Sequence, residues 1–525
     1  MNIRLLLALA LALPACTSGQ SGATTDITHA AVRPKGAAQA PAPSNTDWVP
    51  GYLDAAAKAD LIEDDEKRCL EYPDIPGLSW DKAIVASRCG FLRAPALRLD
   101  DIESRLDASD GAQALDAYYA ARLQAAGTGP DAGARQDGLF ADFDVFSRYG
   151  LAGDIAREWL RHDPESPYAH LAVGMQALYE AQMARGTTYA SDIPEGQDAY
   201  FVERGKAALE HLLTAARTLP ELTPACALGA DAANLLGEQE AWQELVGICL
   251  RTAPASYGFN IAWAGGTSEL WGGSELDRNA VRDNVVKYRK SNPALTSVET
   301  LLDLDKVGPR AETSGSRVDA LREAAAYAPN SLVLSRISYG YYQQGNIWLA
   351  SAYAAQAYRF WPRDDTYLDT RYGHAARTGR FDDVLRIQRQ RLVLNPYRLT
   401  SLASAYRLPH FIAQRDSDGA GEPMPADVDK KSTDALNAGN CLEQQVMVNP
   451  FFKTARACTA ELVEQSPDSA YAWLTSAEWK LRTRKDPRKD IDRFLSLADR
   501  DDPYLAPLIH RYERLRTRLP KTTTL

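Results

Sequence analysis

The chain has 525 residues, 24% of them charged, and a formal net charge of −10. Acidic and basic side chains are mixed along it without a basic stripe, which excludes the composition typical of nucleic-acid-binding proteins. After the first residues no apolar run reaches the roughly 18 residues that a membrane-spanning helix needs, which excludes a multi-spanning membrane protein.

The first 15 residues have the layout of a signal peptide. A charged start, Met1 to Arg4, leads into an apolar stretch from Leu5 to Leu13 that is too short for a permanent membrane helix. The motif Leu13-Pro14-Ala15-Cys16 follows and resembles the lipobox of bacterial lipoproteins. This resemblance implies cleavage before Cys16 and acylation of that residue, and several acyl chains together form a stable anchor. The alternative is an ordinary secretory signal with a chance cysteine.

Residues 16 to 46 are rich in Ser, Thr, Gly, Ala and Pro, and they end in the sequence AAQAPAPSNT. Such a stretch buries too little apolar surface to fold, so it is expected to be a flexible tether. Thr17, not aspartate, follows Cys16. By resemblance to Gram-negative lipoprotein sorting, this favours the periplasmic face of the outer membrane over retention at the inner membrane.

Seven cysteines are present, and lipidation of Cys16 would leave six. Six cysteines allow 15 pairings, but these six lie close together two by two. The pairs are Cys69 with Cys89, Cys226 with Cys249, and Cys441 with Cys458. An exported protein meets an oxidising compartment, so we expect three local disulfides, each worth roughly 3 kcal/mol. Six buried free thiols are the alternative, and no CxxC or CxxH spacing indicates a metal site.

A period near 34 residues runs through the middle of the chain. Gly345 and Gly379 are 34 residues apart, and so are Pro220 and Pro254. A helix–turn–helix of this period resembles the tetratricopeptide repeat. The clearest copy is Ser331–Pro362, in which small residues of the second helix allow neighbouring helices to approach closely.

Four further units are expected, with looser matches to the repeat. They are Thr223–Pro254, Asp364–Pro396, Leu436–Pro467 and Tyr471–Pro503. Alternating β-branched runs and Asn-Gly turns are scarce, so strands are not indicated. The sequence therefore predicts an all-α fold, an α-solenoid of tetratricopeptide-like helical hairpins with insertions.

The positions of two cysteine pairs support these hairpins. In an antiparallel helical hairpin, residues equidistant from the turn face each other. The midpoint of Cys226 and Cys249 is 237.5, beside Gly237, and the midpoint of Cys441 and Cys458 is 449.5, at a turn signal. We therefore expect each pair to join the two helices of one hairpin.

The expected organisation has five parts. A signal peptide (1–15) and a tether (16–46) precede an N-terminal helical domain (47–309), the tetratricopeptide-like repeats (310–410) and C-terminal helical repeats (430–525). Two polar insertions, Arg185–Tyr200 and His410–Asp429, interrupt the helices. Insertions in solenoids often lie on the binding face, and the alternative is a surface loop without a role.

Residues Asp100 to Leu304 carry a second resemblance. Helix pairs separated by an insertion precede the element Trp271-Gly272-Gly273-Ser274. This order is similar to domain-of-unknown-function family 4034. The resemblance implies architecture but no mechanism. A Gly-Gly-Ser turn can cradle an anion, but without a Walker lysine or a preceding strand a tight connection between helices is the favoured interpretation.

Candidate catalytic and metal-binding groups are scattered. His162 and His170 lie near Asp163, and the acids Asp142 and Asp144 could serve as acid and base, although solvated faces explain them better. The segment 416–422 resembles a calcium loop but lacks ligands at two required positions. The sequence therefore indicates no catalytic residue, no metal site and no cofactor.

Aromatic residues crowd the clearest repeat. Tyr339, Tyr342, Trp348 and Tyr353 are candidates for a binding surface, because rigid aromatic area suits peptide recognition. Packing within the core of the array is the alternative for the same residues.

The sequence favours a non-enzymatic scaffold that binds a protein or peptide and is held at the outer membrane by its lipid anchor alone. Two other functions remain open. One is an envelope enzyme whose site is assembled from dispersed residues, and the other is a periplasmic immunity lipoprotein. A solenoid fold does not choose among these functions.

Overall fold

The computed structural model describes residues 45–93, 97–127, 132–147, 152–185, 197–267, 273–302, 315–416, 424–447, 453–483 and 485–519. Within these ranges every regular element is a helix, which confirms the predicted all-α fold. The signal peptide, Cys16 and the tether lie outside the described residues. No described helix combines the length and apolarity needed to cross a bilayer.

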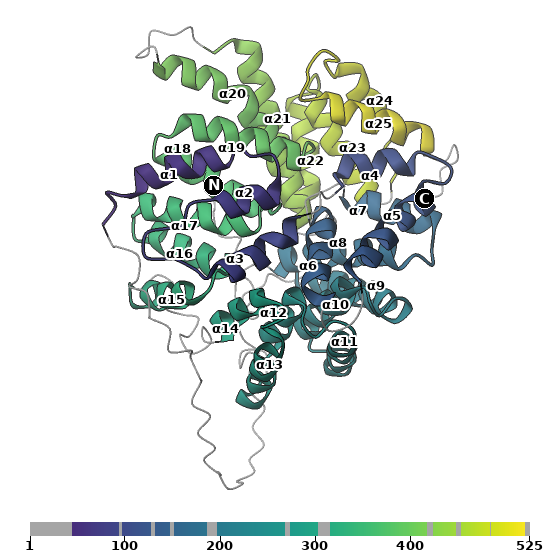
Figure 1. Ribbon diagram of the computed structural model, residues 1–525. Coiled ribbons are helices and arrows are strands. Elements are labelled where there is room, and N and C mark those ends of the chain that lie inside the picture. The colour runs from purple at the N-terminus through teal and green to yellow at the C-terminus, as the bar shows by residue number, and fades with distance from the viewer. Residues whose placement is uncertain are drawn as a thin grey trace.

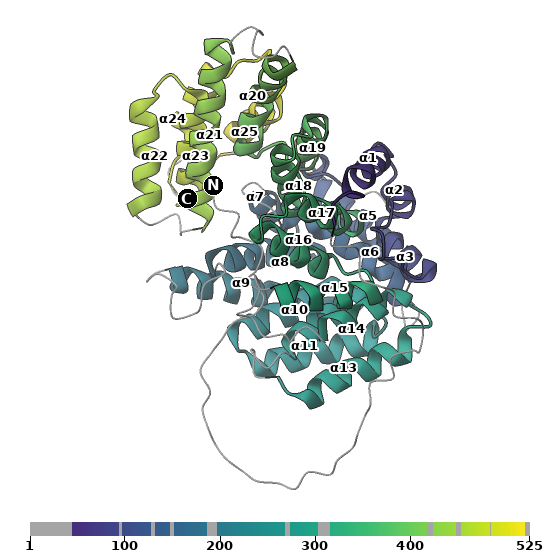
Figure 2. The same cartoon turned by 90° about the vertical axis from the view of Figure 1, so that its left-hand side faces the viewer.

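The first helices form what we call the N-terminal layer, residues 49 to 146. Its elements are α1 (Val49–Ala59), α2 (Asp65–Glu71), α3 (Lys82–Cys89), η1 (Gly90–Leu92), α4 (Leu99–Leu106), α5 (Gly111–Ala126), α6 (Gly133–Phe143) and η3 (Asp144–Phe146). Figures 1 and 2 show that these helices lie together over one face of the remaining helices.

The remaining helices form what we call the helical array. Its first part comprises α7 (Ala152–His162), α8 (Pro167–Arg185), α9 (Gln197–Thr218), α10 (Thr223–Leu236), α11 (Gln239–Thr252), α12 (Tyr257–Gly266), α13 (Glu275–Tyr288), η6 (Pro293–Leu295) and α14 (Thr296–Leu302). Its second part comprises α15 (Gly315–Tyr327), α16 (Ser331–Gln343), α17 (Ile347–Phe360), α18 (Asp365–Arg377), α19 (Phe381–Leu394) and α20 (Leu399–Asp416). Its third part comprises α21 (Ala426–Met447), α22 (Lys453–Gln465), α23 (Ala470–Arg482), α24 (Arg488–Leu497) and α25 (Ala506–Arg518).

Each of the five repeat units expected from the sequence is a helical hairpin. In the clearest unit, Gly345 follows α16 with φ +78°, and the side chain of Asn346 then caps α17 by accepting from the Leu349 amide. Gly379 and Gly237 have φ of +71° and +73° in the α18–α19 and α10–α11 turns. A positive φ is readily adopted by glycine, which explains the regular spacing of these residues. The array is a solenoid of tetratricopeptide-like hairpins.

The array runs once around the molecule and returns to its start. In Figure 1 its helices can be followed from α7 and α8 through α12 and α16 to α20, and then to the C-terminal helices beside α7. The return is a packing contact, because α21 packs against α8. The chain therefore brings its last third against helices that precede it by more than 200 residues in the sequence.

Among the described residues, two hydrophobic cores group the helices differently from the predicted domains. The larger core joins residues of η1 and α4–α14 to residues of α20–α25. The smaller core joins α1–α3 to α15–α20. In it, Leu53, Ile75 and Trp80 of the N-terminal layer are buried together with apolar residues of the repeats. The predicted N-terminal domain, residues 47–309, is thus shared between two cores. Helices α1–α3 pack on repeats far along the chain, a pairing that no local pattern reveals.

The predicted loop His410–Asp429 is wrong at both ends. Helix α20 continues through Pro409 to Asp416, and α21 already begins at Ala426. Leu408 and Ile412, four residues apart on α20, are buried in the smaller core, and this burial offsets the helix-breaking tendency of Pro409. In the other predicted insertion, α8 extends to Arg185 and α9 begins at Gln197, and residues 186–196 lie outside the described structure.

Candidate functional site

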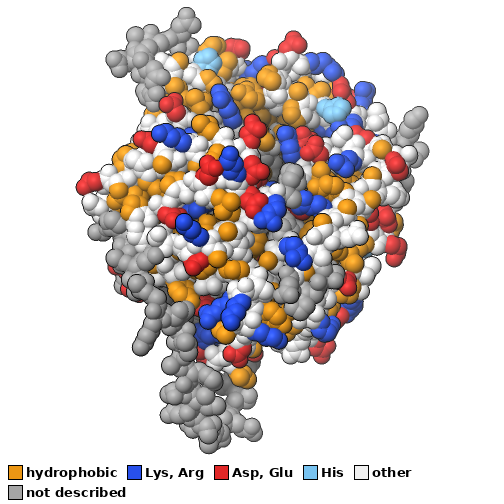
Figure 3. Space-filling view, in the orientation of Figure 1, with side chains coloured by type: hydrophobic (Ala, Val, Ile, Leu, Met, Phe, Trp, Pro, Cys, Tyr) orange, Lys and Arg blue, Asp and Glu red, His pale blue; other side chains and the backbone are white. Residues whose placement is uncertain are grey.

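The N-terminal layer and the helical array meet through acids on the layer and arginines on the array. The acids are Asp60, Asp65, Asp74, Glu103 and Asp142, and the arginines are Arg359, Arg363, Arg371, Arg386, Arg511 and Arg514. On the outer face seen in Figure 3, by contrast, basic, acidic and hydrophobic side chains are interspersed. Acidic and basic side chains are therefore separated at the contact between the layer and the array, with the acids on the layer and the arginines on the array.

Asp60 is at the centre of the contact between α1 and the repeats. Its side chain is fully buried, and its two ion pairs are with Arg371 at 2.5 Å and Arg386 at 3.1 Å. The Arg371 guanidinium also lies 4.4 Å from the ring centroid of Tyr358. Burial disfavours the charge of Arg371, but Asp60 outweighs this and raises the pKa of Arg371. The pair joins residues 311 positions apart.

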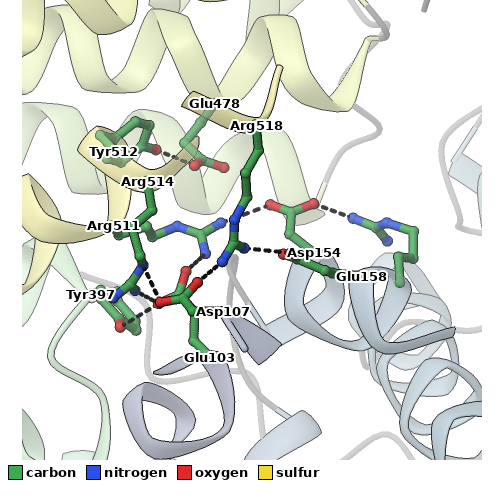
Figure 4. Close-up of polar contacts among 11 residues, drawn as sticks. Glu103, Asp107, Asp154, Glu158, Tyr397, Glu478, Arg511, Tyr512, Arg514 and Arg518 are labelled. Carbon is green, nitrogen blue, oxygen red and sulfur yellow. Dashed lines mark hydrogen bonds and ion pairs between the residues drawn. The ribbon is translucent and has the colours of Figure 1, made fainter. Parts of the chain in front are cut away.

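A second group of charges joins α25 to α4, α7 and α23, and we call it the α25 cluster (Figure 4). Its members are Glu103, Asp107, Asp154, Glu158, Tyr397, Glu478, Arg511, Tyr512, Arg514 and Arg518. Arg511, Arg514 and Arg518 follow one another at spacings of three and four residues, which places them on one side of the helix. The sequence thus forms a basic face on α25 that meets acids from two distant helices.

Glu103 receives the most contacts in the α25 cluster. Its carboxylate pairs with Arg511 at 2.8 Å and Arg514 at 2.5 Å, and it accepts a hydrogen bond of 3.2 Å from the Tyr397 hydroxyl. Arg511 also pairs with Asp154 at 3.2 Å. Arg518 pairs with both Asp107 and Glu158. The helix at the C-terminal end of the array is thereby tied to the N-terminal layer and to the start of the array.

Two carboxyl groups of the cluster have pKa values displaced in opposite directions. Burial and the charge of Asp154 raise the pKa of Glu478, which accepts a hydrogen bond from Tyr512. Burial would raise the pKa of Asp154 as well, but Arg157 and Arg511 outweigh it and lower that pKa. Such a division occurs in catalytic acid–base pairs, and structural ion networks produce it too. Each carboxylate of the cluster is paired with an arginine or accepts a hydrogen bond from a tyrosine. We therefore interpret the α25 cluster as a structural contact that holds the helices together.

Asp137 of α6 organises a third polar centre. Its carboxylate, 1% exposed, accepts hydrogen bonds from the Ser256 hydroxyl at 2.6 Å and from the amides of Tyr257 and Gly258 at 2.8 and 2.9 Å. Asn292 donates a fourth at 3.1 Å. Burial raises the pKa of Asp137 to about 6, although these bonds act in the opposite direction. The residue holds the N-terminus of α12 against the N-terminal layer.

The predicted aromatic surface is only partly accessible. Tyr353 is fully buried and packs against Tyr341 with 5.6 Å between ring centroids, so it belongs to the core and not to a binding surface. Tyr339, Tyr342 and Trp348 are half-buried. The ring of Tyr342 stacks on His374, whose pKa burial lowers to about 4. Helix α17 turns Tyr353 inward because it shares the buried side of the helix with small residues.

All three predicted cysteine pairs lie at disulfide distance. Their Cα atoms are 5.5 Å apart for Cys69–Cys89, 5.8 Å for Cys226–Cys249 and 5.9 Å for Cys441–Cys458. The second pair joins α10 to α11 and the third joins α21 to α22, as the symmetry of the hairpins predicts. The first joins α2 to α3 within the N-terminal layer.

Other sequence candidates have mostly structural positions. Asp142 does not lie on a solvated face, since it is 1% exposed and pairs with Arg122 at 2.5 Å. His170 contacts His211, not His162 or Asp163. Among the described side chains no group of three or more His, Cys, Asp or Glu is placed to hold a metal ion. Residues 417–422 of the calcium-like segment lie outside the described residues.

The end of the WGGS element acts as a helix start. Trp271 and Gly272 lie outside the described residues, but Ser274 caps α13 by accepting from the Asp277 amide, and Asp277 accepts in turn from the Ser274 amide. A Cβ atom on Gly273 would lie 2.2 Å from the Thr267 carbonyl oxygen, so only glycine fits. This agrees with a tight connection between two helices.

The layer–array contacts were not identified from the sequence. The three arginines on one face of α25 were a visible signal, because a basic face on a helix indicates acidic neighbours. The partners of Arg511, Glu103 and Asp154, precede it by 408 and 357 residues. Nothing local in the sequence indicates which acids they meet.

No protein-family model matches the chain, so the resemblance of residues 100–304 to family 4034 gains no support. No curated protein matches it either. Among solved structures, the chain is similar to the TPR domain of P58(IPK), with 13% identity, coverage of 70% of this chain and 94% of that chain, and a TM-score of 0.18. It is also similar to the APC/C hetero-tetramer Cut9–Hcn1, with 12% identity, coverage of 90% and 96%, and a TM-score of 0.22. We rest the fold on the helices themselves.

Proposed function

We propose that this protein is a non-enzymatic helical-repeat scaffold for a protein or peptide partner, anchored through Cys16 to the periplasmic face of the outer membrane. The observation that carries the scaffold is the array of paired helices, closed on itself by buried ion pairs and thus suited to hold a surface in a fixed shape. Extended repeat surfaces of this kind commonly bind other chains.

The address of the protein rests on the sequence. The lipobox-like motif at Leu13 to Cys16 favours a lipid anchor, and the polar segment that follows it favours a flexible tether. The three cysteine pairs at disulfide distance are consistent with an oxidising compartment. Non-reducing peptide mapping of protein from cell envelopes should recover these three pairs, and free thiols or other pairings would contradict a periplasmic location.

The anchor has a direct test. Cells expressing the wild type or Cys16→Ser are labelled with a palmitate analogue and fractionated. The wild type should carry label and sediment with outer membranes, whereas Cys16→Ser should be unlabelled and absent from them. Equal labelling of the two proteins would exclude acylation at Cys16.

The best-supported partner surface is the exposed part of the α16–α17 hairpin. Tyr339 and Tyr342 are three residues apart on α16, so they project from the same side of the helix, and both remain half-buried. Their exposed ring edges offer rigid contact area at low entropic cost. We assign Tyr353 no part in binding.

A photo-crosslinking amino acid at Tyr339 tests this surface in intact cells. A scaffold should give one discrete adduct of the same mass in repeated experiments. The same substitution at Tyr288, a partly buried aromatic residue of α13, is the matched control. Adducts at Tyr288 but none at Tyr339 would move the partner surface elsewhere. Absence of adducts at both positions would count against a scaffold function.

A further inference from the structure

Arg88, near the end of α3, is a buried arginine that has no ion pair among the described residues. Its side chain is 1% exposed, and its Nε and Nη1 atoms have no hydrogen-bond acceptor there. The guanidinium lies over two aromatic rings, 4.0 Å from the ring centroid of Tyr257 and 4.9 Å from that of Phe91. Such contacts offset part of the cost of burying a charge. A buried charge is normally paired and hydrogen-bonded as well.

The acids in the neighbourhood do not pair with Arg88. Burial raises the pKa of Asp137 to about 6, and the charge of Arg88 acts against this rise. Both carboxylate oxygens of Asp137 are already occupied, since each accepts two hydrogen bonds from other groups. Asp144 and Asp364 act on the pKa of the neighbouring Tyr367, and neither is bonded to Arg88. The buried cation therefore has no directly bonded counter-ion in the described part of the chain.

The other polar groups around Arg88 are hydroxyls whose protons have no acceptor among the described residues. The Tyr257 hydroxyl accepts from the Asn330 amide at 3.5 Å, and that amide also donates to the Ser297 carbonyl at 3.1 Å. The hydroxyl of Ser297 is buried without a partner. Burial raises the pKa of Tyr367 well above its ordinary value, and the charge of Arg88 opposes this rise. Three hydroxyls and a guanidinium are thus gathered as donors.

Packed elements hold these donors in place. Ser87, beside Arg88, donates to the Asn292 side chain at 2.7 Å and accepts from the Ala294 amide at 3.3 Å. These bonds fix the end of α3 against η6, which leads directly into α14, the helix of Ser297. Helix α12 begins at Tyr257 and packs on α14. The donors come from the N-terminal layer and from two parts of the array, so they meet only in the folded chain.

Buried donors with a positive charge and no acceptor match the requirements of an anion. A water molecule could accept some of these hydrogen bonds, but it would not balance the charge of Arg88. Arg88 and Tyr367 are only 1% and 8% exposed, which favours a monatomic ion over a phosphate or carboxylate group. The nearby acids Asp137, Asp144 and Asp364 favour a single negative charge over two.

We propose that Arg88 binds a chloride ion inside the molecule, with the hydroxyls of Tyr257, Ser297 and Tyr367 as further donors. The ion would neutralise the arginine where α3 of the N-terminal layer meets the array, and its binding would stabilise the folded state. This site is independent of the scaffold function and of the lipid anchor, because it lies in the interior and involves neither Cys16 nor the aromatic surface.

Thermal unfolding in mixtures of sodium chloride and sodium gluconate at constant ionic strength tests the site. The full chain contains Cys16→Ser, and gluconate is the reference because a closed site excludes so large an anion. The unfolding midpoint should rise with chloride and reach a plateau, as for a ligand that binds only the folded state. Bromide should act as chloride does, and sulfate should not. An unchanged midpoint would indicate water only, and a rise without a plateau would indicate a general salt effect. Either result would overturn the proposal.

Three variants assign the response to Arg88. Arg88→Met removes the charge at similar volume and should abolish the dependence on chloride. Arg516→Met is the matched control, because Arg516 is a 57% exposed residue of α25, and it should respond as the parent does. Tyr367→Phe should raise the chloride concentration of half effect about tenfold, since a hydrogen bond to a charged group is lost.

Circular dichroism checks that each variant is folded, and Tyr367→Phe decides the test if Arg88→Met is not. A chloride response in Arg88→Met equal to that of the parent would refute the site. Equal loss of the response in Arg516→Met would refute it too, and so would an unchanged half-effect concentration in Tyr367→Phe where Arg88→Met does not fold.

Discussion

Arg511 is the residue through which the end of the chain is joined to its beginning. Its side chain is 4% exposed, and its guanidinium contacts Glu103 at 2.8 Å and Asp154 at 3.2 Å. A buried ion pair need not stabilise a protein more than apolar packing would, but removal of one partner leaves the other charge buried and unpaired. The contribution of Arg511 is therefore best measured against a surface pair on the same helix.

Arg511→Ala should lower the free energy of unfolding by about 1.5–3 kcal/mol, because Glu103 loses one of its two guanidinium partners and keeps Arg514 and the Tyr397 hydroxyl. Arg516→Ala is the matched control, since Arg516 pairs with Asp492 where the two side chains are 57% and 50% exposed. Such a pair contributes about 0–1 kcal/mol. Urea unfolding of both variants measures the difference, and equal losses would contradict a joint formed by buried charges.

Asp137 gives a pH dependence whose sign follows from its burial. Its pKa is about 6 in the folded chain, against an ordinary value of 3.8. The folded state therefore holds a proton that the unfolded state releases between about pH 4 and pH 6, and stability falls as pH rises through this window. Asp137→Asn does not titrate and serves as reference. Unfolding free energies at several pH values should show the wild type losing its relative stability from pH 4 to pH 6. A constant or growing relative stability would be inconsistent with the raised pKa.

At the scale of elements, close backbone contact decides how the N-terminal layer meets the array. Gly133 begins α6 where the chain passes directly over the backbone before α12. A Cβ atom there would lie 2.4 Å from the carbonyl carbon of Ala255 and 2.5 Å from the Ser256 amide nitrogen. Backbone atoms cannot rotate away as a flexible side chain can, so α6 itself would have to shift.

Gly133→Ala should therefore destabilise the protein by about 1–3 kcal/mol through overpacking. Gly51 in α1 is the control, because a Cβ atom there has no neighbour within 4 Å. Gly51→Ala should stabilise by roughly 0.5–1 kcal/mol through helix propensity alone. Thermal or urea unfolding distinguishes the two signs. If both substitutions changed stability in the same direction, the contact between α6 and α12 would not have the tightness described here.

At the scale of the molecule, the N-terminal layer is part of both cores. Helices α1–α3 bury the apolar side of the repeats, and their carbonyl and carboxylate groups pair with array arginines, as Asp74 and the Cys69 carbonyl do with Arg359. Among the described residues, α1–α3 cover an apolar and positively charged face of the repeats from α15 to α20.

A chain lacking residues 45–92 should not fold stably, although its repeats remain complete. Removal would expose the smaller core and leave Arg359, Arg363 and Arg371 without their partners from α1 and α2. We expect low soluble yield, strong binding of a hydrophobic dye and loss of cooperative thermal unfolding. A soluble truncated protein with the melting temperature of the full chain would show that the array is stable without the layer.

Local signals in the sequence determined the helices, the hairpins and the cysteine pairs. Helical periodicity, a glycine at three of the hairpin turns and a 34-residue period are properties of neighbouring residues. The nearly equal distances of Cys226 and Cys249 from Gly237 follow from hairpin geometry alone. These features can be predicted without knowing which distant residues are in contact. The address at Cys16 is also a local motif, and it stays a prediction.

Only the tertiary structure decided how the helices assemble and which side chains remain available. Tyr339 and Tyr353 belong to the same hairpin and are equally suited by their chemistry to a binding surface, yet Tyr339 is half-buried and Tyr353 is fully buried. Likewise, Arg371 meets Asp60 and Arg511 meets Glu103 across 311 and 408 residues. Burial and long-range pairing depend on how all elements pack at once, because each helix offers several faces and several equivalent charges. Local sequence therefore specified the units, and packing selected their partners.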